Sequence, residues 1–178
     1  MMFTKEVMEQ FTELDFAVYD CIVKHKKQLH KITIKELAAM ALKILVKSKC
    51  ILFIGIGTSG ILGKYGARYF SNVGYFSLFI DDPWLPILQN PSEGTVMIVL
   101  SESGMTTQTL YIASHLQQRG CPLISVTNNA NSVLAKMADC NISYHVTERM
   151  VNDRNVTTQI PVLYIIEALT KRLYNEES

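Results

Sequence analysis

ILFIGIGTSG, from Ile51 to Gly60, begins with an unbroken apolar run and ends in glycine and hydroxyl residues. VMIVLSESGMTTQT, from Val96 to Thr109, repeats this arrangement, and an amphipathic segment follows each run. An apolar run of strand length indicates a strand buried on both faces, as in a parallel sheet. Each segment therefore predicts a buried strand, a tight loop and the start of a helix.

The loops after these two strands have the composition of an anion-binding site. At a helix N-terminus the first backbone N–H groups have no partner within the helix, and they carry the positive end of the helix dipole. Glycine lets the backbone approach an anion, and serine and threonine hydroxyls add donors. Because parallel strands end at the same edge of a sheet, we expect both loops to lie there and to bind a phosphorylated small molecule.

The rest of the chain alternates between strand and helix patterns. Apolar runs predict five strands, at residues 51–57, 75–80, 95–100, 122–126 and 141–146. The segments that follow them predict helices at residues 62–70, 106–119, 132–138 and 157–174. Strand–helix alternation with short connections requires right-handed crossovers. We therefore predict an α/β fold, a doubly wound five-stranded parallel sheet flanked by helices.

Two further helical segments precede the first strand. Apolar residues recur at helical spacing through residues 3–30, and Thr33 with Glu36 forms a capping-box pair that opens the next helix. We divide the chain into an N-terminal helical extension, residues 1–34, and a main domain, residues 35–178. The apolar stripe of the extension needs a partner surface, so we expect a homodimer or a higher homo-oligomer.

Composition narrows the class of protein. The 178 residues suffice for one domain with an appended helical element, and 48% of them are hydrophobic. The net charge is +1, and a solvated helical face explains the slightly basic residues 1–50 better than nucleic acid does. The four cysteines form no CxxC pair and no metal-ligand spacing, so we expect reduced thiols and no metal. We also expect no cofactor. Without a signal peptide or an apolar run of ~20 residues, we expect a cytoplasmic protein that does not bind membranes.

Three motifs in this order resemble the SIS (sugar isomerase) domain. They are GIGTSG after the first strand, SESGMT after the third, and TNNANSVLAKMAD from Thr127 to Asp139. The resemblance implies a flavodoxin-like SIS fold in which the second loop wraps the phosphate of a sugar phosphate. Carried over by position, it implies ligand binding by residues of the two loops: Gly57, Thr58, Ser59, Ser101, Glu102, Ser103, Gly104 and Thr106.

Within that family the sequence is most similar to the effector domain of RpiR-type transcriptional regulators of carbohydrate metabolism. The tail that begins at Arg149 and contains QIPVLYIIEAL resembles theirs, and residues 14–38 resemble the opening helices of their helix-turn-helix domain. The chain then passes through MALKILVKSKC into the first strand without a recognition helix. We therefore expect a sugar-phosphate sensor that binds DNA only if a complete helix-turn-helix is supplied elsewhere.

Two other functions stay open at this stage. A sugar-phosphate aldose–ketose isomerase needs a general base near a carbon-bound proton, and the candidates are Glu102, His145 and Glu148, with Glu167 in the last helix. None of them stands at a position that matches the isomerases. The glycine spacing of GIGTSG also matches the dinucleotide fingerprint G-x-G-x-x-G. A nucleotide-binding sheet, however, has no need of the hydroxyl-rich second loop.

Overall fold

The computed structural model describes residues 34–80, 82, 85 and 89–176 of the chain. The chain divides into two units, Met1–Thr33 and Ile34–Ser178, and the second is the one considered below. The helix expected within residues 3–30 lies outside the described residues, and so does Thr33 of the capping pair. The helical extension over residues 1–34 therefore stays a prediction.

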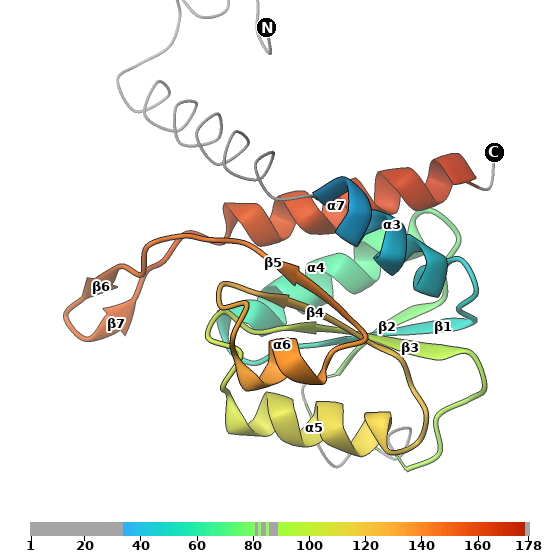
Figure 1. Cartoon of the computed structure of the whole chain (residues 1–178), viewed down its shortest axis with the longest axis horizontal. Helices are drawn as coiled ribbons and strands as arrows, with labels where there is room; N and C mark the ends of the chain where they lie inside the picture. The colour runs from blue at the N-terminus through green and yellow to red at the C-terminus, as the bar shows by residue number, and fades with distance from the viewer. Residues whose placement is uncertain (1–33, 81, 83–84, 86–88, 177–178) are drawn as a thin grey trace, which may run out of the picture. The chain divides into compact units, whose positions relative to one another are not determined.

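Five parallel strands form one sheet, and Figure 1 shows them side by side. The strands are β1 (Cys50–Ile54), β2 (Ser77–Ile80), β3 (Thr95–Leu100), β4 (Leu123–Thr127) and β5 (Cys140–Ser143). Their order is β2-β1-β3-β4-β5, and every neighbouring pair is parallel. The order reverses between β1 and β3, which is the topological switch point of such a sheet. The predicted doubly wound five-stranded parallel sheet is confirmed.

Helices cover both faces of this sheet. The described helices are α3 (Ile34–Leu45), α4 (Thr58–Ser71), α5 (Thr107–Gln117), α6 (Val133–Met137) and α7 (Ile160–Glu176). In Figure 1, α3, α4 and α7 lie over one face, and α5 and α6 lie over the other. Within the described ranges, no helix combines the length and the apolar character that a membrane crossing requires.

The central strands are buried at every position, with two apolar layers on their two sides. Leu52 of β1 and Met97 of β3 pack with Ile112 of α5 in one layer. Phe53, the next residue of β1, belongs to the opposite layer, where its ring meets Phe70 of α4 edge-on at a centroid distance of 5.2 Å. Burial on both faces explains why these strands are apolar throughout rather than alternating.

Two strands end earlier than predicted, because the residues that follow them belong to a helix cap or form hydrogen bonds with a side chain. Strand β1 ends at Ile54, because Gly57, with a φ of 60°, is already the N-cap of α4. Strand β5 ends at Ser143: Tyr144 N makes the last bond to β4, to Thr127 O at 3.0 Å, and Val146 is bonded to a side chain instead of a strand. Val146 N donates to Asn128 Oδ1 at 2.6 Å, and Val146 O accepts from Asn128 Nδ2 at 2.7 Å.

A short hairpin between β5 and α7 is absent from the sequence prediction. Its antiparallel strands are β6 (Met150–Val151) and β7 (Arg154–Asn155), joined by Asn152 and Asp153. Both turn residues have positive φ values, 49° and 59°, as the two-residue turn that suits hairpin twist requires. The hairpin projects away from the sheet in Figure 1. Strands of two residues are too short to produce a periodic pattern, which explains why the sequence analysis missed them.

The packing of α4 on β1 depends on Gly66, because a Cβ at this position would overlap the Phe53 ring. At a solvent-exposed helix position, replacing glycine by alanine stabilises the protein by about 1 kcal/mol, whereas overpacking a core destabilises it by about 1–3 kcal/mol. We expect Gly66→Ala to lower the free energy of unfolding measured by urea titration. Arg68→Ala, at an exposed position of the same helix, should change it by less than about 0.5 kcal/mol. Equal or greater stability of the Gly66→Ala protein would contradict this packing.

Candidate functional site

A cavity of about 610 Å³ lies beyond the carboxyl ends of β1 and β3. These ends are adjacent, since Ile54 of β1 pairs with Val99 of β3. The wall is formed by Ile56, Thr58, Ser59, Leu100, Ser101, Glu102, Ser103, Met105, Thr106, Thr109, Asn128, Asn129, Glu148, Asn155, Val156, Thr157 and Gln159. Open parallel sheets bind their ligands at this switch point, so the cavity is the candidate binding site.

Most of the residues predicted to bind ligand lie in the cavity wall. They are Thr58, Ser59, Ser101, Glu102, Ser103 and Thr106. Gly57 and Gly104 are not part of the wall and instead shape the two loops: the first is the N-cap of α4, and the second has a φ of 64°. The structure therefore gathers both predicted loops around one space. Whether these residues contact a ligand stays a prediction.

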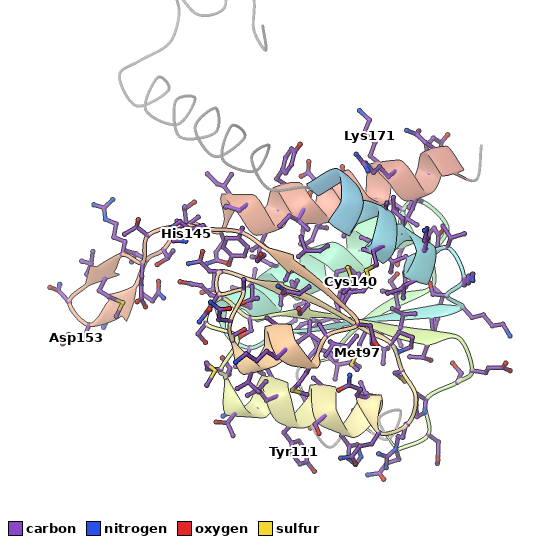
Figure 2. The ribbon with its side chains drawn as sticks, viewed as in Figure 1. Met97, Tyr111, Cys140, His145, Asp153 and Lys171 are labelled. Atoms are coloured by element: carbon purple, nitrogen blue, oxygen red, sulfur yellow. The ribbon has the colours of Figure 1, made fainter. Side chains whose placement is uncertain are left out.

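The candidate general bases are separated by the fold. Glu102 and Glu148 line the cavity, whereas His145 does not. His145 is exposed and lies past the end of β5, where Figure 2 shows it at the start of the segment that leads to the hairpin. Glu167 lies on α7 outside the cavity, and its Oε1 accepts a hydrogen bond of 2.7 Å from Tyr65 Oη. Two carboxylates are thus the only ionisable side chains among the described residues of the wall.

The loop after β3 is closed by its own hydroxyl groups. Ser101 is buried, and its Oγ accepts a hydrogen bond of 3.2 Å from Gly104 N and lies 3.4 Å from Thr106 Oγ1. Ser103 Oγ accepts a hydrogen bond of 3.2 Å from Met105 N. A hydroxyl oxygen that accepts a backbone N–H still has its own proton to donate. The loop therefore fixes the positions of its serine oxygens and keeps donors for another group.

The N-termini of α4 and α5 both lack a capping side chain. Neither N-cap residue, Gly57 or Thr106, makes a side-chain capping bond, and neither first turn contains an acidic residue. Helix α6 is capped in the usual way, with Ser132 Oγ accepting a hydrogen bond of 3.2 Å from Ala135 N. An uncapped N-terminus leaves backbone N–H donors and a partial positive charge. Two such termini border the same cavity.

Two buried hydroxyls near the cavity, Thr109 Oγ1 and Tyr144 Oη, find no hydrogen-bond partner in the described part of the chain. Thr109 is 1% exposed and belongs to the first turn of α5, in the cavity wall. Burial, and then the charge of Glu102, raise the pKa of Tyr144, so this phenol lies close to the carboxylate and stays protonated at neutral pH. A buried polar group without a partner costs about 1–3 kcal/mol, which a ligand atom bonded to Thr109 would recover.

The sequence analysis missed the contribution of the segment between β5 and α7. Asn155 Nδ2 donates to Glu102 Oε1 at 3.1 Å and to Glu148 Oε1 at 3.4 Å. Gln159 Nε2 donates to Glu102 Oε2 at 3.0 Å. Both oxygens of the Glu102 carboxylate are thus oriented by neutral amides. The signals available in the sequence were the Asn-Asp pair at 152–153, which favours a two-residue turn, and the QIP motif that contains Gln159.

The loop after β3 also packs closely against the loop after β4. Glu102 O accepts a hydrogen bond of 2.9 Å from Asn128 N, and Gly104 O accepts one of 3.1 Å from Leu134 N. A Cβ on Gly104 would overlap the Ser132 side chain, which caps α6. Glycine is required here for two reasons: its φ is positive, and the space beside it is filled.

Gly104→Ala tests this close packing, with Gly74→Ala as its matched control. Gly74 also has a positive φ, 94°, but no atom lies within 4 Å of the position that a Cβ would take. Both variants carry the cost of a positive φ, about 1–2 kcal/mol, and only the first adds an overlap with Ser132. We expect the Gly104 variant to unfold at a clearly lower urea concentration than the Gly74 variant. Equal midpoints for the two proteins would show that the Ser132 contact has no energetic weight.

The comparison with known protein families agrees with this geometry. A family model described as the SIS domain matches residues 44–170. The chain belongs to the SIS domain family. The resemblance stated from the three loop motifs is therefore confirmed, and the cavity of this SIS domain lies inside the matched region.

Curated relatives of this SIS domain include regulators and enzymes. An uncharacterized HTH-type transcriptional regulator from Clostridium perfringens is 22% identical over 135 residues, 75% of this chain and 48% of the regulator. The arabinose 5-phosphate isomerase KpsF from Escherichia coli is 31% identical over 98 residues, 54% of this chain and 31% of the isomerase. The chain spans about half the length of the curated regulators it matches.

Solved structures show the same fold. The sugar isomerase domain of an RpiR transcription factor from Sphaerobacter thermophilus aligns with a TM-score of 0.79 at 16% identity, covering 93% of this chain and 92% of that domain. The Vibrio vulnificus NanR protein, complexed with ManNAc-6P, aligns with a TM-score of 0.74 at 20% identity, covering 95% of this chain and 63% of NanR. These likenesses establish the SIS fold of the chain.

Proposed function

We propose that this SIS domain binds a phosphorylated sugar or amino sugar and acts as the effector-sensing part of an RpiR-type transcriptional regulator of carbohydrate metabolism. The observation that carries the proposal is the uncapped N-terminus of α5, which borders the cavity among the hydroxyls of the loop after β3. A phosphate dianion matches such a terminus in charge and in hydrogen-bonding capacity.

The phosphate position that we infer lies between this loop and the first turn of α5. Ser103 and Thr106 supply hydroxyl donors from the loop, and the buried Thr109 Oγ1 is a donor that has no partner within the described chain. No described wall residue is cationic, so main-chain amides and hydroxyls bind the phosphate here, as lysine or arginine does in other phosphate sites. The sugar then extends toward Thr58 and Ser59 on one side and Glu102 on the other.

The regulatory part of the proposal draws on the relatives. NanR was solved with ManNAc-6P, and the HTH-type relatives are transcriptional regulators. DNA binding by this protein requires a complete helix-turn-helix, which we infer to come from elsewhere if it is present at all. A homodimer that transmits ligand occupancy and a location in the cytoplasm complete the proposal, and both stay predictions.

Replacing the hydroxyl donors tests the phosphate site. Ser103→Ala and Thr106→Ala each remove a charge-assisted hydrogen bond worth about 1.5–3 kcal/mol, so the Kd for a sugar phosphate should rise roughly 10- to 150-fold. Thr107→Ala, an exposed neighbour that does not line the cavity, is the control and should leave Kd unchanged. The measurement is calorimetric titration with the sugar phosphate that gives the largest thermal stabilisation in a screen. Unchanged affinity in both cavity variants would refute the phosphate site.

A second function, sugar-phosphate aldose–ketose isomerisation, is favoured by one observation: Glu102 and Glu148 both line the cavity, within reach of a bound sugar. A carboxylate there could remove a carbon-bound proton. In the described chain, however, amide hydrogen bonds hold both oxygens of Glu102 in place, and His145, the third candidate base, lies outside the cavity wall. Sensing without turnover is therefore the function that the geometry supports better.

NMR distinguishes the two functions directly. We expect each sugar phosphate that stabilises the protein to remain chemically unchanged after prolonged incubation, with no exchange of the C2 proton for deuterium in D₂O. Interconversion of aldose and ketose phosphates that disappears in Glu102→Gln or Glu148→Gln would establish the isomerase instead. The Thr106→Ala protein, in which we expect weakened binding, is the control for both the stabilisation and the turnover measurement.

A further inference from the structure

The charge of the cavity restricts which phosphorylated sugar it can accept. Among the described wall residues, Glu102 and Glu148 carry charge, and no lysine, arginine or histidine accompanies them. Arg149 and Arg154, the cationic residues nearest to Glu148 in sequence, are exposed and do not line the wall. A sugar phosphate is itself a dianion. A sugar phosphate with an uncharged ring would therefore bring its phosphate into a space that already holds two carboxylates, and no cationic side chain of the described wall offsets them.

The two carboxylates converge on one side of the cavity. Asn155 Nδ2 lies 3.1 Å from Glu102 Oε1 and 3.4 Å from Glu148 Oε1, so a single amide bridges the pair. Gln159 Nε2 holds the other oxygen of Glu102 at 3.0 Å. Neutral amides orient a carboxylate without cancelling its charge, and each carboxylate has about four acceptor positions. Acceptor positions on Glu102 and Glu148 thus remain for a ligand group.

Another part of the cavity wall is suited to the phosphate. The uncapped N-terminus of α5 lies there, and the wall includes Thr109, whose buried Oγ1 has no partner in the part of the chain that the structure describes. The cavity wall thus combines hydrogen-bond donors, suited to an anion, with two carboxylates, suited to a cation. A ligand that carries both charges matches both regions.

We propose that the effector is an amino sugar phosphate with a free, unacylated amine, whose ammonium group pairs with Glu102 and Glu148 while its phosphate binds at α5. This inference rests on the proposed function, because it assumes that the phosphate binds at the α5 terminus. Glu102 is then the residue that determines specificity. An N-acetyl group would remove the positive charge and leave both carboxylates without a counter-charge, and a hydroxyl in place of the amine would do the same.

Calorimetric titration with matched sugar phosphates tests the inference. The probes are the 6-phosphates of glucosamine, galactosamine and mannosamine, each compared with its N-acetyl form and its hydroxyl counterpart, at a mildly acidic pH where the amine is protonated. We expect at least one free amine to bind 10-fold or more tightly than both of its counterparts. Equal or weaker binding of the free amine in all three sets would overturn the inference.

Carboxylate variants test the assignment to Glu102. In Glu102→Gln, the Kd for the preferred amine should rise at least 10-fold while the Kd for its hydroxyl counterpart stays constant or falls, so that the preference is lost. Glu148→Gln, at an exposed position, should shift the preference in the same direction and guards against misfolding of the first variant. Glu167→Gln, which lies outside the cavity, is the charge-matched control and should keep the wild-type preference. An equal loss for amine and hydroxyl ligands in both cavity variants would overturn the assignment.

Failure of the inference differs from failure of the proposed function. If sugar phosphates bind and Thr106→Ala weakens their binding, but no free amine binds more tightly than its counterparts, the phosphate site stands and the charge argument is wrong. If no phosphorylated probe binds, the proposed function fails and the inference fails with it.

Discussion

All five strands of the sheet point in the same direction, and this constraint decides where chemistry can occur. Parallel strands gather their carboxyl ends, and the helix N-termini that follow them, at a single edge. The switch between β1 and β3 then separates α4 and α5 onto opposite faces, so the loops that precede them flank one opening. The cavity is a consequence of topology, and the loop residues determine what it binds.

The electrostatics of this cavity come from the backbone more than from side chains. Uncapped helix termini provide partial positive charge, while the ionised side chains of the described wall are both acidic. Donors from serine and threonine add hydrogen bonds without adding charge. Such a site can bind an anion through these donors while its ionised side chains remain acidic, a combination that a phosphate site built on lysine does not offer.

Features of the fold and of the cavity can be predicted from the sequence when the residues that determine them are close together in the chain. Strand β3 falls within its predicted bounds, 95–100, because an unbroken apolar run between polar residues is a local signal. The loops beside Thr58 and Ser103 are local too, since their composition marks a helix start. The bonds from Asn155 and Gln159 to Glu102 span 53 and 57 residues and depend on the path of the short hairpin over residues 150–155. No local sequence pattern predicts that path, so the contribution of Asn155 and Gln159 to the cavity is visible only in the folded structure.

The contact between the loops after β3 and β4 has a consequence for binding energetics. Asn128 and Leu134 donate to backbone carbonyls of the first loop, and Ser132 fills the space beside Gly104, so contacts within the protein itself order this loop. A loop that is already ordered loses little conformational entropy when an anion arrives, whereas ordering each free residue would cost about 1–2 kcal/mol. The protein has therefore met that entropic cost during folding, and the interaction energy of the ligand is left for affinity and discrimination.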